Sequence, residues 1–121
     1  MKVAIGADHA GFELKEKLRE YLRDEDYEVI DVGPAAFEPG DDYPVYAAQV
    51  GRMVSTGEAD RGILVCDSGI GVDIVANKFT GVRSALVHDE ELARLTRQHN
   101  DTNVLSLGAM FLDDDKARRI V

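Results

Sequence analysis

The residues with the clearest chemical potential are a lone thiol and the glycine loop that follows it. Cys66 is the only cysteine of the chain, and residues 66–71 read Cys-Asp-Ser-Gly-Ile-Gly after an apolar run. Backbone N–H groups in a loop that opens onto a helix form an anion site. A thiolate can remove a carbon-bound proton while loop N–H groups hold the enediolate oxygens. These parts suit an aldose–ketose isomerisation, which needs no metal.

A carboxylate and two imidazoles could complete this chemistry. Asp8 and His9 follow the first apolar run, and His99 lies in the polar segment 97–101. A histidine can move the hydroxyl protons that such an isomerisation also requires. Each group has a purely structural interpretation as well. Cys66 could be a small buried hydrophobe, Asp8 the cap of the next helix, His99 a helix C-cap, and the loop glycines a tight turn.

Five apolar, β-branched runs alternate with helical patterns along the chain. The expected strands cover residues 2–7, 28–32, 62–66, 83–88 and 103–108. Helices are expected at residues 12–22, 44–56, 72–79, 89–97 and 113–121, with a loop at 33–42. The run Ile-Leu-Val at 63–65 shows no alternation, which indicates a strand buried on both faces of a parallel sheet. This order predicts one doubly wound α/β domain, with five parallel strands in the order 2-1-3-4-5.

That topology places the chemical groups relative to one another. In open α/β sheets, ligands bind outside the carboxyl ends of the strands, where the strand order reverses. The crevice between the first and third strands therefore brings Asp8 and His9 next to Cys66 and its loop. His99 precedes the fifth strand and is expected at the opposite edge of the sheet, or within reach of a partner chain.

Composition narrows the class of protein. The net charge of −9 argues against a general nucleic-acid binder, although a local pocket can still hold a small anion. No long apolar stretch predicts a membrane span, and a lone cysteine suits a reducing cytoplasm. Metal-ligand spacing and a phosphate loop are absent from the sequence, and Gly69-Ile70-Gly71 is a weak dinucleotide signal. We therefore expect a cytoplasmic protein that acts on a small molecule.

Six segments, in order along nearly the whole chain, form a specific pattern. They are Gly-Ala-Asp-His-Ala-Gly-Phe-Glu-Leu-Lys at 6–15, Asp-Tyr-Pro at 42–44, Gly-Ile-Leu-Val-Cys at 62–66, Ser-Gly-Ile-Gly at 68–71, Ala-Asn-Lys at 76–78 and Arg-Gln-His-Asn-Asp-Thr-Asn at 97–103. Together they resemble the ribose-5-phosphate isomerase B family, which includes the galactose-6-phosphate isomerase subunits. The resemblance implies a three-layer Rossmann-like (flavodoxin-like) fold and a homodimer, or dimer of dimers, with active sites at the subunit interface. It also implies one sugar-phosphate isomerase domain over residues 1–121, which lacks the family's C-terminal helix.

The resemblance further assigns a role to each candidate residue. It makes Cys66 the base that moves a proton between C1 and C2 through a cis-enediol(ate); Val72 stands where a second branch of the family has a glutamate. Asp8 and His99 are implied to open the furanose ring. The implied catalytic set is Cys66, His99, Asp8 and Ser68. The implied substrate-binding set is His9 at the phosphate, Tyr43 and Asn100 at the sugar, and the loop residues Gly69, Ile70 and Gly71. No metal or other cofactor is implied.

Two positions depart from the family's usual pattern. Asp67 stands where the family usually has glycine, and a carboxylate beside a thiol disfavours the thiolate unless it points away. Met110 stands where the family has arginine, and the C-terminal arginines that normally grip the phosphate fall beyond Val121. The simplest implied reaction interconverts ribose 5-phosphate and ribulose 5-phosphate. The alternatives are another aldose (a hexose 6-phosphate or a free sugar), a partner-dependent isomerase subunit, or a non-enzymatic receiver-like module.

Overall fold

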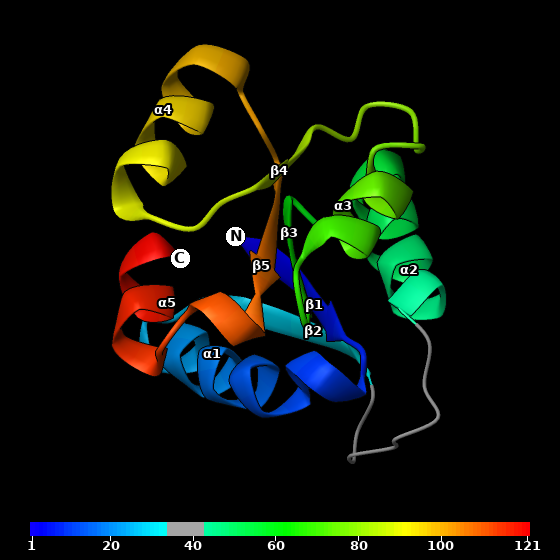
Figure 1. The fold of residues 1–121 in the computed structure, drawn as a ribbon. Coiled ribbons are helices and arrows are strands. Elements are labelled where there is room, and N and C mark those ends of the chain that lie inside the picture. The colour runs from blue at the N-terminus through cyan, green and yellow to red at the C-terminus, as the bar shows by residue number, and fades with distance from the viewer. Residues whose placement is uncertain (34–42) are drawn as a thin grey trace.

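The computed structural model describes residues 1–33 and 43–121, in which strands and helices alternate (Figure 1). The strands are β1 (Lys2–Ala7), β2 (Glu28–Gly33), β3 (Arg61–Cys66), β4 (Ser84–Leu86) and β5 (Val104–Gly108). The α-helices are α1 (Phe12–Asp24), α2 (Tyr43–Thr56), α3 (Ile70–Ala76), α4 (Glu90–Asn100) and α5 (Asp114–Ile120). Two short 3-10 helices, η1 (His9–Gly11) and η2 (Ala109–Phe111), follow β1 and β5.

Every predicted strand and helix is present. Where the observed bounds of α3 and α4 differ from the predicted ones, the backbone conformation at the helix end explains the difference. α3 begins at Ile70, two residues early, because Gly69 adopts a left-handed backbone with φ 83° that turns directly into the helix. α4 continues to Asn100 and ends at Asp101, whose φ of 49° breaks the helix. Of the predicted loop at 33–42, Gly33 is the last residue of β2, and residues 34–42 lie outside the described residues.

The sheet is parallel throughout, with the strand order β2-β1-β3-β5-β4. The predicted Rossmann-like α/β fold is therefore confirmed, but the predicted order of the last two strands is wrong. β5 lies beside β3, where Cys66 pairs with Gly108, and β4 forms the edge of the sheet. β5 is buried along most of its length, whereas the three residues of β4 are only half-buried, as an interior and an edge strand should be. The longer apolar strand takes the interior place.

Helices cover both faces of this sheet, as Figure 1 shows. On one face, Val3 and Ile5 of β1 pack with the apolar sides of α1 and α5. On the other face, the alternate residues pack with α2 and α3, among them Leu64 and Cys66 of β3. Side chains alternate between the faces of a strand, so β1 and β3 contribute to both cores. The Cys66 side chain consequently lies on the face covered by α2 and α3.

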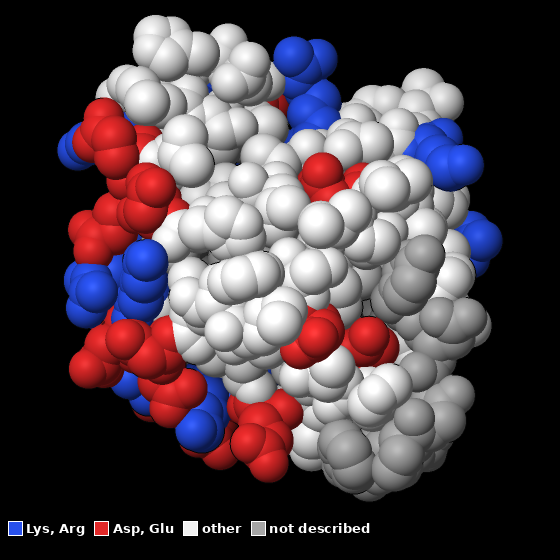
Figure 2. Space-filling model, in the orientation of Figure 1, with Lys and Arg blue, Asp and Glu red and all other residues white. Residues whose placement is uncertain are grey.

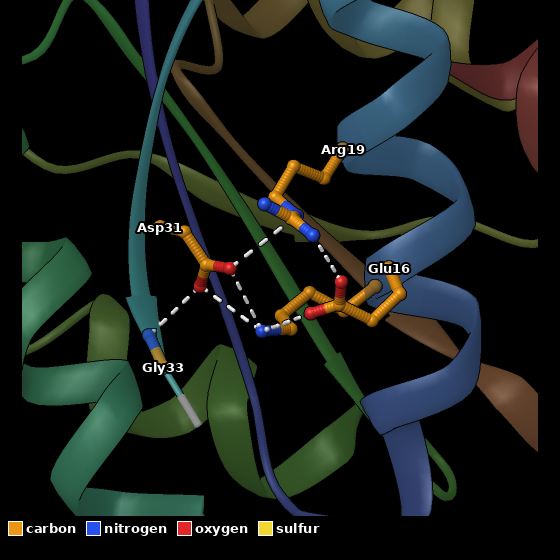
Figure 3. Close-up of polar contacts among 5 residues, drawn as sticks. Glu16, Arg19, Asp31 and Gly33 are labelled. Carbon is orange, nitrogen blue, oxygen red and sulfur yellow. Dashed lines mark hydrogen bonds and ion pairs between the residues drawn. The ribbon is translucent and has the colours of Figure 1, made fainter. Parts of the chain in front are cut away.

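A buried ionic cluster joins α1 to the end of β2 (Figure 3). Lys15 is fully buried, and its Nζ lies 3.0 Å from both carboxylate oxygens of Asp31 and 3.0 Å from Glu16. Asp31 Oδ1 also accepts the backbone N–H of Gly33 at 2.9 Å. Burial raises the pKa of Glu16, but hydrogen bonds from Lys15 and Arg19 outweigh that effect and hold the pKa below its usual value. We call Lys15, Glu16, Arg19 and Asp31 the Lys15 cluster.

Candidate active site

The thiol sits at the carboxyl end of β3, where the chain turns into α3. Cys66 is buried, with 5% of its surface exposed, and its Sγ accepts the backbone N–H of Gly69 at 3.1 Å. A thiolate accepts such a hydrogen bond more strongly than a neutral thiol, because the bond is then charge-assisted. The contact therefore suits a cysteine that acts as a base.

The loop between β3 and α3 can only be built with glycine at its centre. A Cβ on Gly69 would lie 2.5 Å from Cδ1 of Leu86 and 2.9 Å from the backbone carbon of Leu107, and its φ of 83° disfavours other residues. One residue earlier, Ser68 Oγ accepts the N–H of Ile70 at 3.2 Å. The predicted loop residues thus form one compact turn, in which two N–H groups are held by the side chains of Cys66 and Ser68.

Asp8 lies beside this turn, as predicted. Its backbone N–H donates to the carbonyl of Val65 at 3.3 Å, so it sits next to the residue that precedes the thiol. The side chain is buried, and Oδ1 accepts the N–H of Gly11 at 3.0 Å. The structural interpretation is therefore also realised, because Asp8 caps η1. His9 is half-buried and begins η1.

Asp67 and Met110 occupy the outer side of the turn. Asp67 is exposed, whereas Cys66 before it is buried. The Asp67 backbone carbonyl accepts the N–H of Met110 at 3.0 Å, and the Met110 side chain is 61% exposed. A carboxylate in solvent is strongly screened, which weakens its effect on a buried thiol.

His99 and Asn100 do not join the site within one chain. Both are exposed and end α4, just before β5 begins at Val104. Cys66 pairs with Gly108 at the opposite end of β5, and four residue steps of strand span about 13 Å. The expectation that His99 lies at the other edge of the sheet is therefore confirmed. Tyr43 opens α2, and its side chain lies outside the described residues.

Two glycines that shape the turn were missed by the sequence analysis. A Cβ on Gly11 would lie 2.5 Å from the carbonyl oxygen of Val65, and one on Gly108 would lie 2.5 Å from that of Ser68. Both glycines let a neighbouring segment approach the end of β3 closely. A signal was available for Gly11, because it follows the strand that the predicted topology places beside Cys66. None was available for Gly108, because the predicted order put its strand at the edge of the sheet.

The described side chains and helices also bear on metal ions and membranes. Within residues 1–33 and 43–121, no group of three or more His, Cys, Asp or Glu side chains is arranged to hold a metal ion. Over the same described part of the chain, none of the helices has the length and apolar character needed to cross a membrane.

Comparison with known proteins gives a consistent result. The family model described as Ribose/Galactose Isomerase matches residues 3–121. Ribose-5-phosphate isomerase B of Escherichia coli (strain K12) is 46% identical over 120 residues, which cover 99% of this chain and 80% of the relative. D-erythrulose-4-phosphate isomerase of Pectobacterium atrosepticum is 36% identical, covering 100% and 80%. The crystal structure of ribose-5-phosphate isomerase B from Mycoplasma genitalium with bound ribulose-5-phosphate superposes with a TM-score of 0.95 at 41% identity, covering 98% of this chain and 79% of that one. The chain therefore belongs to the ribose/galactose isomerase family of enzymes, together with the ribose-5-phosphate isomerases B.

Proposed function

We propose that the protein interconverts ribose 5-phosphate and ribulose 5-phosphate, with Cys66 as the base. The observation that carries this proposal is the buried Cys66 Sγ, which accepts the Gly69 N–H at the carboxyl end of β3, beside the buried Asp8. The substrate is supported by the relatives whose names give this activity and by the relative with bound ribulose-5-phosphate.

In this mechanism the reaction moves one proton from C2 to C1 and one hydroxyl proton from O2 to O1. The Cys66 thiolate removes the proton from C2 of the open-chain aldose, and the electron pair moves onto the carbonyl oxygen to give a cis-enediol(ate). Return of the same proton to C1, together with transfer of the hydroxyl proton from O2 to O1, gives the ketose, so no oxidant or reductant is consumed. The Gly69 and Ile70 N–H groups are already held by the side chains of Cys66 and Ser68, so the other N–H groups of the turn, those of Ser68 and Gly71, stabilise the oxyanion. Preorganised amides favour charge that develops in the transition state.

The remaining roles follow the implied set. Asp8 and His99 assist opening of the furanose ring, His9 contacts the phosphate, and Tyr43 and Asn100 contact the sugar. We also assign the protein to the cytoplasm, because a lone cysteine that serves as a base must stay reduced.

We propose that a second copy of the chain supplies His99 and Asn100, as a homodimer or a dimer of dimers. One chain keeps them at the far edge of the sheet, yet the turn after Cys66 is flanked by exposed apolar side chains that a partner would cover. Figure 2 shows few charged side chains over the middle of this face. The exposed apolar residues of α3 and η2 are Ile70, Ile74, Met110 and Phe111, each 54% to 61% exposed.

Mixing two inactive variants tests the shared site. Cys66→Ser and His99→Asn should each be inactive, but a hybrid dimer contains one site with both native residues. Random exchange should therefore restore about a quarter of wild-type activity, given a two-fold symmetric dimer. Mixtures that stay inactive after subunit exchange, confirmed by mass spectrometry, would contradict a site built from two chains.

A substrate panel and one variant test the reaction itself. Cys66→Ser should lose about 10²- to 10⁴-fold in kcat, the usual contribution of a positioned base, with Ser55→Ala as the control. The panel should include tetrose, pentose and hexose phosphates and free aldoses, because one relative is named as a D-erythrulose-4-phosphate isomerase. Near-normal turnover in Cys66→Ser would overturn the mechanism, and preference for another sugar would overturn the assigned substrate.

A further inference from the structure

A chain of hydrogen bonds beneath α3 links that helix to the two strands under it. Ser84 Oγ of β4 donates to Asp73 Oδ1 of α3 at 2.6 Å and lies 3.0 Å from Ser106 Oγ of β5. Ser106 is fully buried, while Ser84 and Asp73 are half-buried. We call these three residues the Asp73 cluster. Because they are partly withdrawn from water, breaking their contacts leaves polar groups poorly satisfied.

A second contact fixes the end of α3 to the same strand. Asn77 Oδ1 accepts the backbone N–H of Ser84 at 2.8 Å, and Asn77 Nδ2 donates to the carbonyl of Ser84 at 3.0 Å. The side chain thus bonds both backbone groups of one residue at the edge of the sheet. This gives a structural role to the Ala-Asn-Lys segment at 76–78.

The opposite end of α3 is the candidate site. Gly69, its N-cap, has no side-chain cap bond, and its N–H donates instead to Cys66 Sγ. A helix of seven residues is too short to hold its position by itself, so its placement depends on its contacts. The direction of the Gly69 N–H towards the sulfur therefore depends on the contacts that hold α3 from below.

Charge offers a different explanation for Asp73. An acidic residue in the first turn of a helix is favourable through the helix dipole alone. The helix dipole requires neither the 2.6 Å hydrogen bond between Ser84 and Asp73 nor the contact between Ser84 and the buried Ser106. The two explanations also differ in sign at the thiol. Removing a nearby negative charge favours the thiolate, whereas losing an N–H donor disfavours it.

We propose that Asp73, Ser84 and Ser106 are positioning residues, which fix α3 so that the Gly69 N–H stays directed at Cys66 Sγ. None of the three contacts the substrate in this proposal. The inference rests on the proposed function only in taking Cys66 as the base, and its effect on the thiol is measurable without any turnover.

The test is the pH profile of Cys66 alkylation by iodoacetamide, which reports one site because the chain has one cysteine. Asp73→Ala and Asp73→Asn both remove the charge, but only asparagine keeps an acceptor for Ser84. The midpoint of the profile should lie about half to one pH unit higher in Asp73→Ala than in Asp73→Asn, the value of about one hydrogen bond to the thiolate. Ser84→Ala should shift the midpoint in the same direction relative to Ser84→Thr.

The control is Asp115→Ala, which removes an exposed carboxylate from the first turn of α5 and should leave the midpoint unchanged. In the isomerase assay, Asp73→Ala should lower kcat with little change in KM, and Asp73→Asn should restore it. Equal midpoints in Asp73→Ala and Asp73→Asn, or a lower midpoint in Asp73→Ala, would overturn the proposal. If circular dichroism shows that Asp73→Ala is unfolded, the Ser84 pair decides by the same criterion. A wild-type chain that isomerises no sugar would refute the proposed function and leave the alkylation result standing.

Discussion

Replacing Lys15 by methionine should destabilise the fold strongly, because it removes the fully buried cation of the Lys15 cluster and keeps a similar apolar stem. The Lys15 side chain is fully buried, whereas Asp31 and Glu16 are 17% and 26% exposed. Breaking a fully buried pair costs about 3–5 kcal/mol, and the partial hydration of both carboxylates reduces this to about 2–4 kcal/mol. For a domain of this size the melting temperature should fall by roughly 10 °C.

Urea unfolding at pH 7 measures this cost, and the chain offers a matched control two residues away. Lys17 pairs with Asp114 at 2.8 Å, but both side chains are about half-exposed, so Lys17→Met should change the free energy of unfolding little. Adding Asp31→Asn to Lys15→Met should recover part of the loss, because it neutralises a carboxylate that has lost the Lys15 cation and keeps the 3.5 Å contact with Arg19. Equal losses in the two lysine variants would refute the reasoning.

Two further outcomes are expected from substitution and pH. Gly69→Ala should destabilise the chain more than Gly57→Ala: both glycines have φ 83°, but only at Gly69 would the new Cβ meet Leu86, at 2.5 Å. Gly57→Ala should cost about 1 kcal/mol from backbone strain alone. Chemical unfolding of both variants measures the two costs, and equal costs would contradict the packing at Gly69. The stability difference between wild type and Glu16→Gln should be present at pH 7 and shrink as the pH falls below about 4. The folded-state pKa of Glu16 is lowered, so its contribution is lost as the carboxylate is protonated; a difference that grows in acid would contradict this sign.

The sequence predicted that Asp8 lies beside Cys66 because the signals for this placement are contained in short segments of the chain. The unbroken run at 63–65 indicated a doubly buried strand, and parallel strands bring their carboxyl ends to one edge. Those two facts predict that Asp8 lies beside Cys66. The structure confirms this placement, because the Asp8 N–H donates to the carbonyl of Val65.

Contacts between distant segments were beyond such reasoning. The exchange of β4 and β5 depends on which run forms the longer strand, and the runs predicted at 83–88 and 103–108 have the same length. The Asp73 cluster joins α3, β4 and β5. Its members carry no periodic signal, and Asp73 and Ser106 lie 33 positions apart in the sequence. Lys15 falls on the buried side of α1, but a lysine is expected in solvent, so its charge conceals its place in the core.

Asp67 shows why sequence proximity and electrostatic proximity differ. Its carboxylate follows the thiol directly in the chain, but Cys66 packs against the core under α2 and α3 while Asp67 is exposed. Solvent around an exposed carboxylate weakens its effect on a buried sulfur, so Asp67→Asn should change kcat by less than about threefold. The alkylation midpoint of Cys66 should also move little, and the small shift should shrink further in high salt. A tenfold rise in kcat, or an alkylation midpoint lowered by a full pH unit, would show that the Asp67 carboxylate acts on the thiol. Asp67 would then reduce the fraction of Cys66 present as the thiolate.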